Sequence, residues 1–289
     1  MNTYKIGILL FLLNVQLLFA DEKIKPYILV EAPFSSATQA IETVRDKLTS
    51  AGFELAGQYS PYAGATILVA TSPALKNIAS QSEYGGFGSA IRISITQTDL
   101  GLQLAYLNLE YLMHIYRLGD LSPIGEAMAN ALGAGKPFGS EKGLTAKKLR
   151  KYHYMMGMPY FDSIDELAEY SSHKAAIDSV EANLASGVSG TSKVYRIDLP
   201  DKNVSLFGVG IGEGDGSDST IMRIIDQGDK KHTAHFPYEI LVTDGKVIAL
   251  RGRFRIAQSF PDLSMGSFMK IRSAPGAIQD TLTAVAQPQ

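Results

Sequence analysis

Cysteine and tryptophan are both absent from this chain of 289 residues. Without thiols the chain forms no disulfide and offers no cysteine nucleophile, Cys-type zinc site or Cys-ligated iron–sulfur cluster. The fold must be held by packing alone, which a chain of this length can achieve. Any aromatic surface for a ligand must therefore be built from the 14 Tyr and 12 Phe residues.

A surplus of charge of either sign is also missing. Lys and Arg number 27 and Asp and Glu 29, so the formal net charge is −2. This balance gives no reason to expect a nucleic acid or an anionic membrane surface as a partner. Hydrophobic residues make up 45% of the chain, which is enough for an ordinary globular core.

The N-terminus has the pattern of a secretory signal peptide. Lys5 precedes an apolar run over residues 6–19, and Ala20 supplies a small residue before a polar start. An uncleaved anchor is the alternative, but a spanning helix needs about 20 apolar residues, and Asn14 and Gln16 interrupt this run. We predict cleavage of residues 1–20 and a periplasmic or secreted protein with no stable membrane anchor. The lack of cysteine excludes a bacterial lipid anchor.

The remaining sequence predicts an α+β fold of antiparallel curved sheets, with helices packed on one face and two sheet-bearing halves joined by a helical segment. We place an N-terminal α+β domain at residues 21–108, the helical segment at 109–190 and a C-terminal α+β domain at 191–289. The strand patterns fall at residues 26–31, 53–59, 65–70, 90–96, 102–107, 193–199, 204–211, 220–226, 238–243 and 247–256. The helix patterns fall at 37–51, 73–82, 109–118, 122–133, 145–152, 164–170, 173–185 and 275–286.

Two hairpins, at residues 88–105 and 236–250, share one rhythm of strand, turn and strand after a Gly or Pro. Asp244-Gly245 is the strongest hairpin signal in the chain. The likeness is consistent with an internal duplication, and equally with the general similarity of hairpins.

Several of these features resemble the domain-of-unknown-function family 302. They are the opening strand, the helix that ends in Ala51-Gly52-Phe53, and the hairpin Pro237-Tyr-Glu-Ile-Leu-Val-Thr-Asp-Gly-Lys-Val. The resemblance covers about half of the mature chain and implies either two divergent copies or one expanded copy. It implies a small α+β sandwich with helices on one face of an antiparallel curved sheet. It implies no activity, because the family has none agreed.

Arg251, Arg253 and Arg255 alternate, so a strand would place all three guanidinium groups on one face. Such a row is unfavourable unless an anion or carboxylates face it, and the planar guanidinium suits carboxylate, phosphate or sulfate. We therefore predict an anion site here, with pairing to nearby acidic residues as the alternative. His114 and Arg117, three residues apart on a predicted helix, are further candidates for a ligand cleft.

A metal site is the competing hypothesis. His153, Met155, Met156 and Met158 offer an imidazole and three thioethers within six residues, a set that suits Cu(I) or haem ligation. The alternative is that Met and Tyr fill an irregular part of the core. His232 and His235 are three residues apart, and a site there needs a third ligand from His114, His153, Glu239 or Asp262.

Other short motifs carry less. The glycine-rich residues 208–218 match neither a dinucleotide fingerprint nor a Walker loop, and Ser171-Ser-His-Lys174 lacks its partner motifs. We expect a non-catalytic exported protein that binds a small anionic molecule or a protein partner. An envelope protein that handles copper or haem is the second hypothesis, and a hydrolase with an unrecognised site is the third. The sequence requires no cofactor.

Overall fold

The structure is a computed structural model that describes residues 22–31 and 33–288. The predicted signal peptide lies outside these residues. Within them, no helix is both long and apolar enough to span a bilayer.

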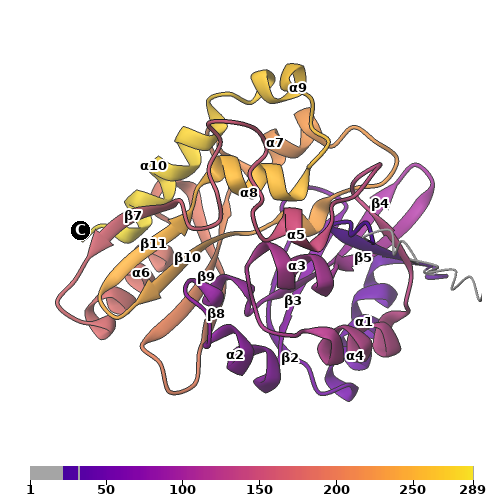
Figure 1. Cartoon of the computed structure of the whole chain (residues 1–289), viewed down its shortest axis with the longest axis horizontal. Helices are drawn as coiled ribbons and strands as arrows, with labels where there is room; N and C mark the ends of the chain where they lie inside the picture. The colour runs from indigo at the N-terminus through magenta and orange to yellow at the C-terminus, as the bar shows by residue number, and fades with distance from the viewer. Residues whose placement is uncertain (1–21, 32, 289) are drawn as a thin grey trace, which may run out of the picture.

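The predicted fold class is confirmed. The chain forms a six-stranded sheet in the order β2-β3-β4-β5-β1-β6 and a five-stranded sheet in the order β7-β11-β10-β9-β8, with every neighbouring pair antiparallel. Figure 1 shows the two sheets side by side, with α1 and α4 at one end of the molecule and α6 and α10 at the other.

The first sheet comprises β1 (Tyr27–Val30), β2 (Glu54–Tyr59), β3 (Ala65–Thr71), β4 (Ile91–Thr98), β5 (Gly101–Leu107) and β6 (Lys136–Phe138). The second comprises β7 (Ile164–Glu169), β8 (Thr191–Asp198), β9 (Val204–Ile211), β10 (Tyr238–Thr243) and β11 (Lys246–Leu250). The α-helices are α1 (Ala37–Ser50), α2 (Pro73–Ala79), α3 (Leu109–Ile115), α4 (Ser122–Leu132), α5 (Ala146–Leu149), α6 (His173–Ser186), α7 (Asp218–Ile225), α8 (Gly252–Ser259), α9 (Met265–Lys270) and α10 (Ala274–Ala286). Short 3-10 helices are η1 (Gly85–Gly88), η2 (Val188–Gly190) and η3 (Thr233–His235).

Three predicted elements are wrong. Residues 164–170 form strand β7 instead of a helix, because pairing with β11 overrides the helix preference of Asp, Glu, Leu and Ala. Residues 220–225 belong to α7, which buries Ile221 and Met222 and ends before Asp226. The strand predicted over 247–256 ends at Leu250, and the chain then turns into α8. The segment 109–190 therefore contains helices but also supplies β6 to one sheet and β7 to the other.

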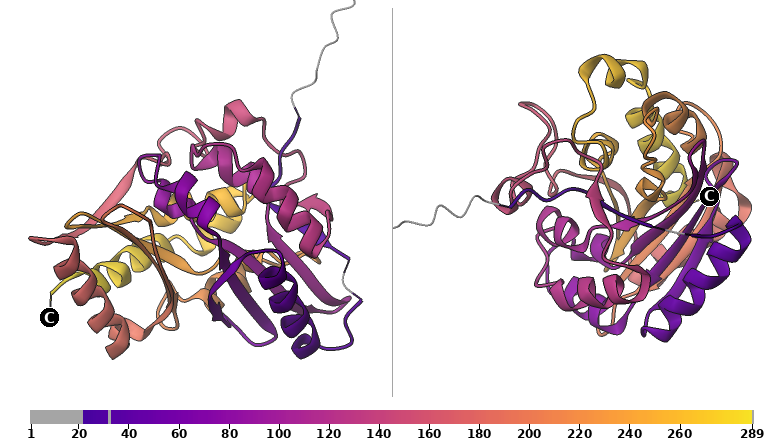
Figure 2. Two further views of the ribbon diagram at one scale, coloured as in Figure 1. Left: turned by 90° about the horizontal axis from the view of Figure 1, so that it is seen from below. Right: turned by 90° about the vertical axis from the view of Figure 1, so that its right-hand side faces the viewer.

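The two halves of the chain repeat one topology. The order β1-α1-β2-β3-α2-η1-β4-β5 recurs as β7-α6-β8-β9-α7-η3-β10-β11, apart from the additional η2 between α6 and β8, and the strand order β2-β3-β4-β5-β1 recurs as β8-β9-β10-β11-β7. Helices α1 and α6 both have 14 residues, and each begins at a serine, Ser36 or Ser172, whose side chain accepts a backbone N–H three residues on. In the left view of Figure 2 these two helices lie at the lower edge, one below each sheet.

The strand irregularities repeat as well. The pairing of β2 with β3 skips Ala56, and the pairing of β8 with β9 skips Val194, so each half has a β-bulge at the same place. The residues after these bulges begin matching rows across the sheets, through Gly57, Val69 and Arg92 in the first and through Tyr195, Gly208 and Glu239 in the second. Arg92 and Glu239 are therefore equivalent positions.

The halves meet around an approximate two-fold relation. Strand β2 contacts its equivalent β8, while η1 packs on β9 and β10 and η3 packs on β3 and β4. At the centre Arg92 Nη1 donates to Glu239 Oε1 at 2.5 Å, with both side chains buried. Contacts between equivalent elements and reciprocal contacts between non-equivalent ones are what a two-fold interface produces. The two repeated halves therefore share one buried interface.

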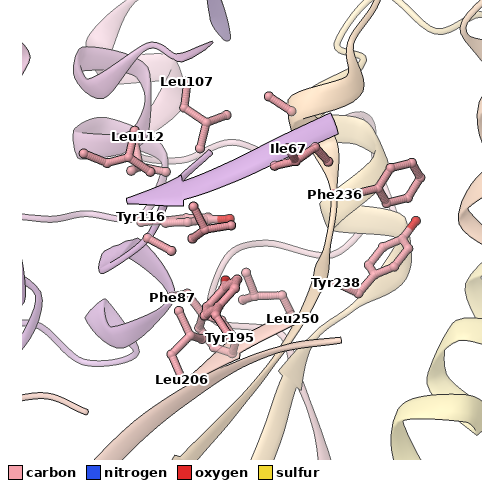
Figure 3. Packing of buried hydrophobic residues seen from close by; sticks show 14 of the residues in the cluster. Ile67, Phe87, Leu107, Leu112, Tyr116, Tyr195, Leu206, Phe236, Tyr238 and Leu250 are labelled. Atoms are coloured by element: carbon pink, nitrogen blue, oxygen red, sulfur yellow. The ribbon is translucent and has the colours of Figure 1, made fainter. Parts of the chain in front are cut away.

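The hydrophobic core runs across this interface. Figure 3 shows Phe87 and Tyr116 of the first half among Tyr195, Leu206 and Leu250 of the second. All five side chains are nearly or completely removed from solvent. The two sheets are thus held together by apolar burial as well as by the central ion pair.

Gly57 follows the bulge of β2 and lies so close to the backbone of β8 that a larger residue at this position should destabilise the protein. A Cβ on Gly57 would lie 2.2 Å from the carbonyl oxygen of Val194, a backbone atom that moves only if the strands separate. We expect Gly57→Ala to lower the free energy of unfolding by about 2 kcal/mol in chemical denaturation. Gly276→Ala is the control, because nothing lies within 4 Å of that added Cβ in α10 and alanine favours helix. Equal stability of the two variants would contradict the tight contact.

Candidate functional site

The predicted arginine face does not form. Arg251 precedes α8, and Arg253 and Arg255 lie on that helix, where residues two apart point in nearly opposite directions. Arg251 Nε lies 3.2 Å from Asp165 Oδ1, so its guanidinium is paired with a protein carboxylate. The geometry proposed for an anion site on these three side chains is therefore wrong.

Arg255 instead belongs to a buried cluster at the interface of the halves. Its Nη2 donates to the carbonyl oxygens of His235 and Pro237 and lies 3.5 Å from Glu239 Oε2. Glu239 Oε1 also accepts from the hydroxyl of Tyr195 at 2.8 Å. The Tyr195 ring crosses directly over Gly208, where a Cβ would meet it at 2.2 Å. These groups contact one another across the interface and support the fold, while Glu239 Oε2 and the Nε and Nη1 of Arg255 have no hydrogen-bond partner among the described residues.

His114 and Arg117 are not brought together in a cleft. Arg117 lies beyond the end of α3 with a positive φ of 54°, and its Nη1 donates to Asp162 at 2.7 Å. His114 is half-buried, and burial together with the nearby Arg150 lowers the pKa of its imidazole. The Arg117 guanidinium is therefore paired with a protein carboxylate. His114 borders none of the larger cavities in the described part of the chain.

The residues of the His/Met cluster lie in a surface turn. His153 Nδ1 lies 2.9 Å from the carbonyl oxygen of Met155, and its ring packs on Tyr160 with centroids 4.5 Å apart. Met155 is exposed, Met156 is 95% exposed, and Met158 is half-buried. The alternative prediction, that these methionines fill a part of the core, is wrong for Met156. Copper or haem ligation by this turn stays a prediction with no geometric support.

The two nearby histidines differ in their surroundings. His235 is buried, with Nδ1 2.8 Å from Ser259 Oγ and Nε2 3.1 Å from the Tyr238 hydroxyl, so both ring nitrogens are occupied. Burial and then the charge of Arg255 lower its pKa well below the usual value. His232 is paired with Asp226. Across the described residues, no three His, Asp or Glu side chains are grouped as metal ligands.

Two adjoining cavities of about 770 and 1010 Å³, which share Ser140 and Asp262, form a broad concave surface. Their walls come from residues 23–25, 137–154, 225–232 and 260–267. Residues 23–25 precede the first repeat. Two further segments, 137–154 with α5 and 260–267 with the start of α9, follow the first and the second repeat and lie outside the repeated elements (Figure 1). The cleft is therefore built mainly by additions to the repeated fold.

The larger space, called here the lysine cavity, is lined by Lys23, Lys142, Lys147, Lys148 and Lys151. The local sequence positions it, because Thr145 Oγ1 accepts the backbone N–H of Lys148 and so begins α5. Leu149 is buried beneath this helix, and the Tyr152 hydroxyl donates to the carbonyl oxygen of Ala257 at 2.8 Å. The lysine-bearing segment is thus tied to α8.

The charge of the lysine cavity is largely uncompensated. Residues 142–161 contain five basic side chains and no acidic one. The carboxylate of Asp262 in the cavity wall accepts from Ser140 Oγ and from the backbone N–H of Glu141. In the described part of the chain, the lysines that form ion pairs lie elsewhere, namely Lys76, Lys136, Lys174 and Lys193. An anion that enters this space meets several cations that have no protein carboxylate as partner.

The smaller space, called here the histidine cavity, contains His232. Its Nδ1 lies 2.7 Å from Asp226 Oδ1, and its backbone N–H donates to Asp226 Oδ2 at 2.8 Å. The imidazole packs against the rings of Tyr27, Phe138 and Phe260, with centroids 4.6 to 5.7 Å apart. The buried carboxylate and the aromatic rings fix the orientation of this imidazole.

Sequence reasoning identified parts of this cleft without joining them. The sequence predicts the helix over residues 145–152 but does not mark its lysines as a site. His232 was considered as a metal ligand, while its partner Asp226 was assigned to a strand. The acid-free run of residues 142–161 was the signal available in the sequence for the lysine cavity.

Comparisons with known proteins give no relative. No family model, no curated protein and no solved structure matches the chain. The resemblance to the domain-of-unknown-function family 302 therefore stays a prediction, as do its two interpretations, two divergent copies or one expanded copy.

Proposed function

We propose that this protein binds a small polyanion, a molecule with several phosphate or carboxylate groups, in the lysine cavity. The observation that carries the proposal is the convergence of five lysines on one cavity of about 1010 Å³ in a chain whose net charge is slightly negative. The anionic ligand expected from the sequence is retained, but its site moves from the arginines of residues 251–255 to these lysines.

Electrostatics favour a multivalent ligand. Clustered ammonium groups repel one another, and an anion with several charges relieves that repulsion while it gains attraction to each group. Lysine is a strongly hydrated point charge on a flexible stem, so it selects charge more than shape. Binding should therefore weaken as salt is added, because the Debye length falls to about 8 Å at physiological ionic strength.

Replacement of the central lysines tests the proposal. We expect Lys147→Gln/Lys148→Gln/Lys151→Gln to weaken binding of pyrophosphate, tripolyphosphate or citrate by about 10- to 100-fold, since each exposed ionic contact is worth up to about 1 kcal/mol. Isothermal titration calorimetry at two salt concentrations measures the effect.

The matched control removes the same charge elsewhere. Lys47→Gln/Lys246→Gln/Lys270→Gln replaces three exposed lysines outside the cavity and should bind as the wild type does. If the two triple variants lose affinity equally, the effect is one of net charge and the proposed site is wrong. Absence of wild-type binding to all three probes has the same consequence.

We also propose export through the N-terminal signal, which the apolar run of residues 6–19 supports. N-terminal sequencing of the native protein should begin at Asp21. A chain recovered from the cytosol that begins at Met1 would overturn the proposal.

A further inference from the structure

We propose that His232 is a catalytic general base that hydrolyses an ester of the anion held in the lysine cavity. The inference rests on the proposed binding function and adds a reaction to it. It is carried by the arrangement of His232 and Asp226 in the wall of the histidine cavity.

Asp226 holds one ring nitrogen and leaves the other available. The carboxylate is buried, and its two oxygens are engaged by the Nδ1 and the backbone N–H of His232. This arrangement places the proton of the neutral imidazole on Nδ1 and the lone pair on Nε2. The carboxylate also stabilises the imidazolium that forms when Nε2 takes a proton.

The surroundings of Nε2 distinguish His232 from the other buried histidine. The His232 side chain is 18% exposed and borders the cavity, and no described residue forms a hydrogen bond with its Nε2. In His235, by contrast, both nitrogens are bonded to protein hydroxyls. His235 is thus satisfied at both nitrogens, whereas the Nε2 of His232 has no partner among the described residues and this side chain borders a space of about 770 Å³.

The cavity walls indicate the class of substrate. Phe138, Ile225, Phe260 and Leu263 form an apolar part, and Lys25 and Lys230 lie in the same wall as the acidic Glu141, Asp229 and Asp262. Ser140 and Asp262 connect this space to the lysine cavity. These features fit an ester that joins a polyanionic acid, bound by the lysines, to an apolar or aromatic alcohol beside His232.

The reaction is a hydrolysis without redox change. Nε2 accepts a proton from water as the water oxygen attacks the acyl carbon or the phosphorus atom. The bond from that centre to the ester oxygen breaks, and the imidazolium returns the proton to the departing oxygen. The products are the free acid and the alcohol, so no co-reactant besides water is consumed.

Three p-nitrophenyl esters serve as probes: mono-p-nitrophenyl succinate, p-nitrophenyl phosphate and bis(p-nitrophenyl) phosphate. We expect the full mature chain to release p-nitrophenolate from at least one of them faster than buffer does. His232→Gln should lower kcat by about 100-fold or more, and Asp226→Asn by about 10-fold or more, while the double variant is no slower than His232→Gln alone. Such non-additivity is expected of residues that act as a unit.

The controls separate catalysis from folding and from binding. His173→Gln, at the start of α6 and outside both cavities, should keep the wild-type kcat, and all variants should keep the wild-type melting midpoint within a few degrees. If His232→Gln melts much lower, His232→Asn is used and judged by the same ratio of kcat values. Pyrophosphate binding without hydrolysis of any probe, or hydrolysis that is equal in His232→Gln, would overturn this inference and leave the binding function standing. Loss of pyrophosphate binding itself would overturn the proposed function.

Discussion

Replacement of Glu239 by Gln should destabilise the protein by about 3–5 kcal/mol. Glu239 is the buried carboxylate between two buried guanidinium groups, those of Arg92 and Arg255. Gln keeps the shape and one acceptor but removes the charge, so two cations are left in the interior without a counter-ion. Chemical denaturation at neutral pH measures the change.

A surface pair supplies the control for this result. Lys174 and Asp178 form an exposed i,i+4 ion pair on α6, and such pairs contribute about 0.5 kcal/mol or less. Asp178→Asn should therefore be nearly neutral. If Glu239→Gln is as mild as Asp178→Asn, the interior of the interface tolerates unpaired charge and the ion pair between the halves is not a determinant of stability.

The second large effect concerns Asp218 and the pH. Asp218 is completely buried at the start of α7, where its Oδ2 accepts from the Tyr59 hydroxyl at 2.6 Å and its Oδ1 has no partner. Burial raises the pKa of this carboxyl to about 8. The unfolded chain releases the proton near pH 3.9. Between these values the folded state binds more protons than the unfolded state, so stability falls as the pH rises from about 4 to about 8.

Asp218→Asn removes this dependence. The amide oxygen can still accept from Tyr59, and no charge is buried at high pH. We expect the variant to gain stability relative to the wild type as the pH rises from 5 to 8, by an amount on the order of 4 kcal/mol. Urea denaturation at four pH values gives the difference directly, and Asp46→Asn on the exposed face of α1 should follow the wild type. A constant difference between Asp218→Asn and the wild type across this range would show that Asp218 is ionised in the folded protein.

Local sequence signals predicted those elements whose ends are fixed by their own side chains. Helices α1 and α6 are predicted from their local sequence patterns, and in the structure Ser36 and Ser172 cap them. The hairpin of β10 and β11 is predicted from Asp244-Gly245, a dipeptide that favours a tight turn, and in the structure Asp244 takes a positive φ there. In these cases the information lies within a few residues of the chain.

The elements that were missed depend on distant partners. Strand β7 is a strand because β11 offers an edge to pair with, and α8 is a helix although Arg251, Arg253 and Arg255 alternate like a strand. The charge pattern was read as a surface face, yet the fold buries Arg255 against Glu239. Periodicity alone does not reveal which face of a segment will meet a buried carboxylate from a distant part of the chain.

The candidate cleft could not be predicted from local sequence patterns for a similar reason. Its lysines come from α5 and from both sides of it, its imidazole from the segment between α7 and η3, and its aromatic walls from β6 and the end of α8. Each part is a short ordinary segment. Only the packing of the additions against the repeated sheets brings these parts to one place.

The sequence by itself determined the absence of thiol chemistry, the balance of charge, the α+β class and most helices and strands, because these follow from composition and from contacts close along the chain. The tertiary structure alone decided the two-fold arrangement of the halves, the pairing of Arg92 with Glu239, and the convergence of the lysines and His232 on one cleft. These features arise between residues many positions apart, where the free energy of packing and desolvation, rather than local preference, selects the partner.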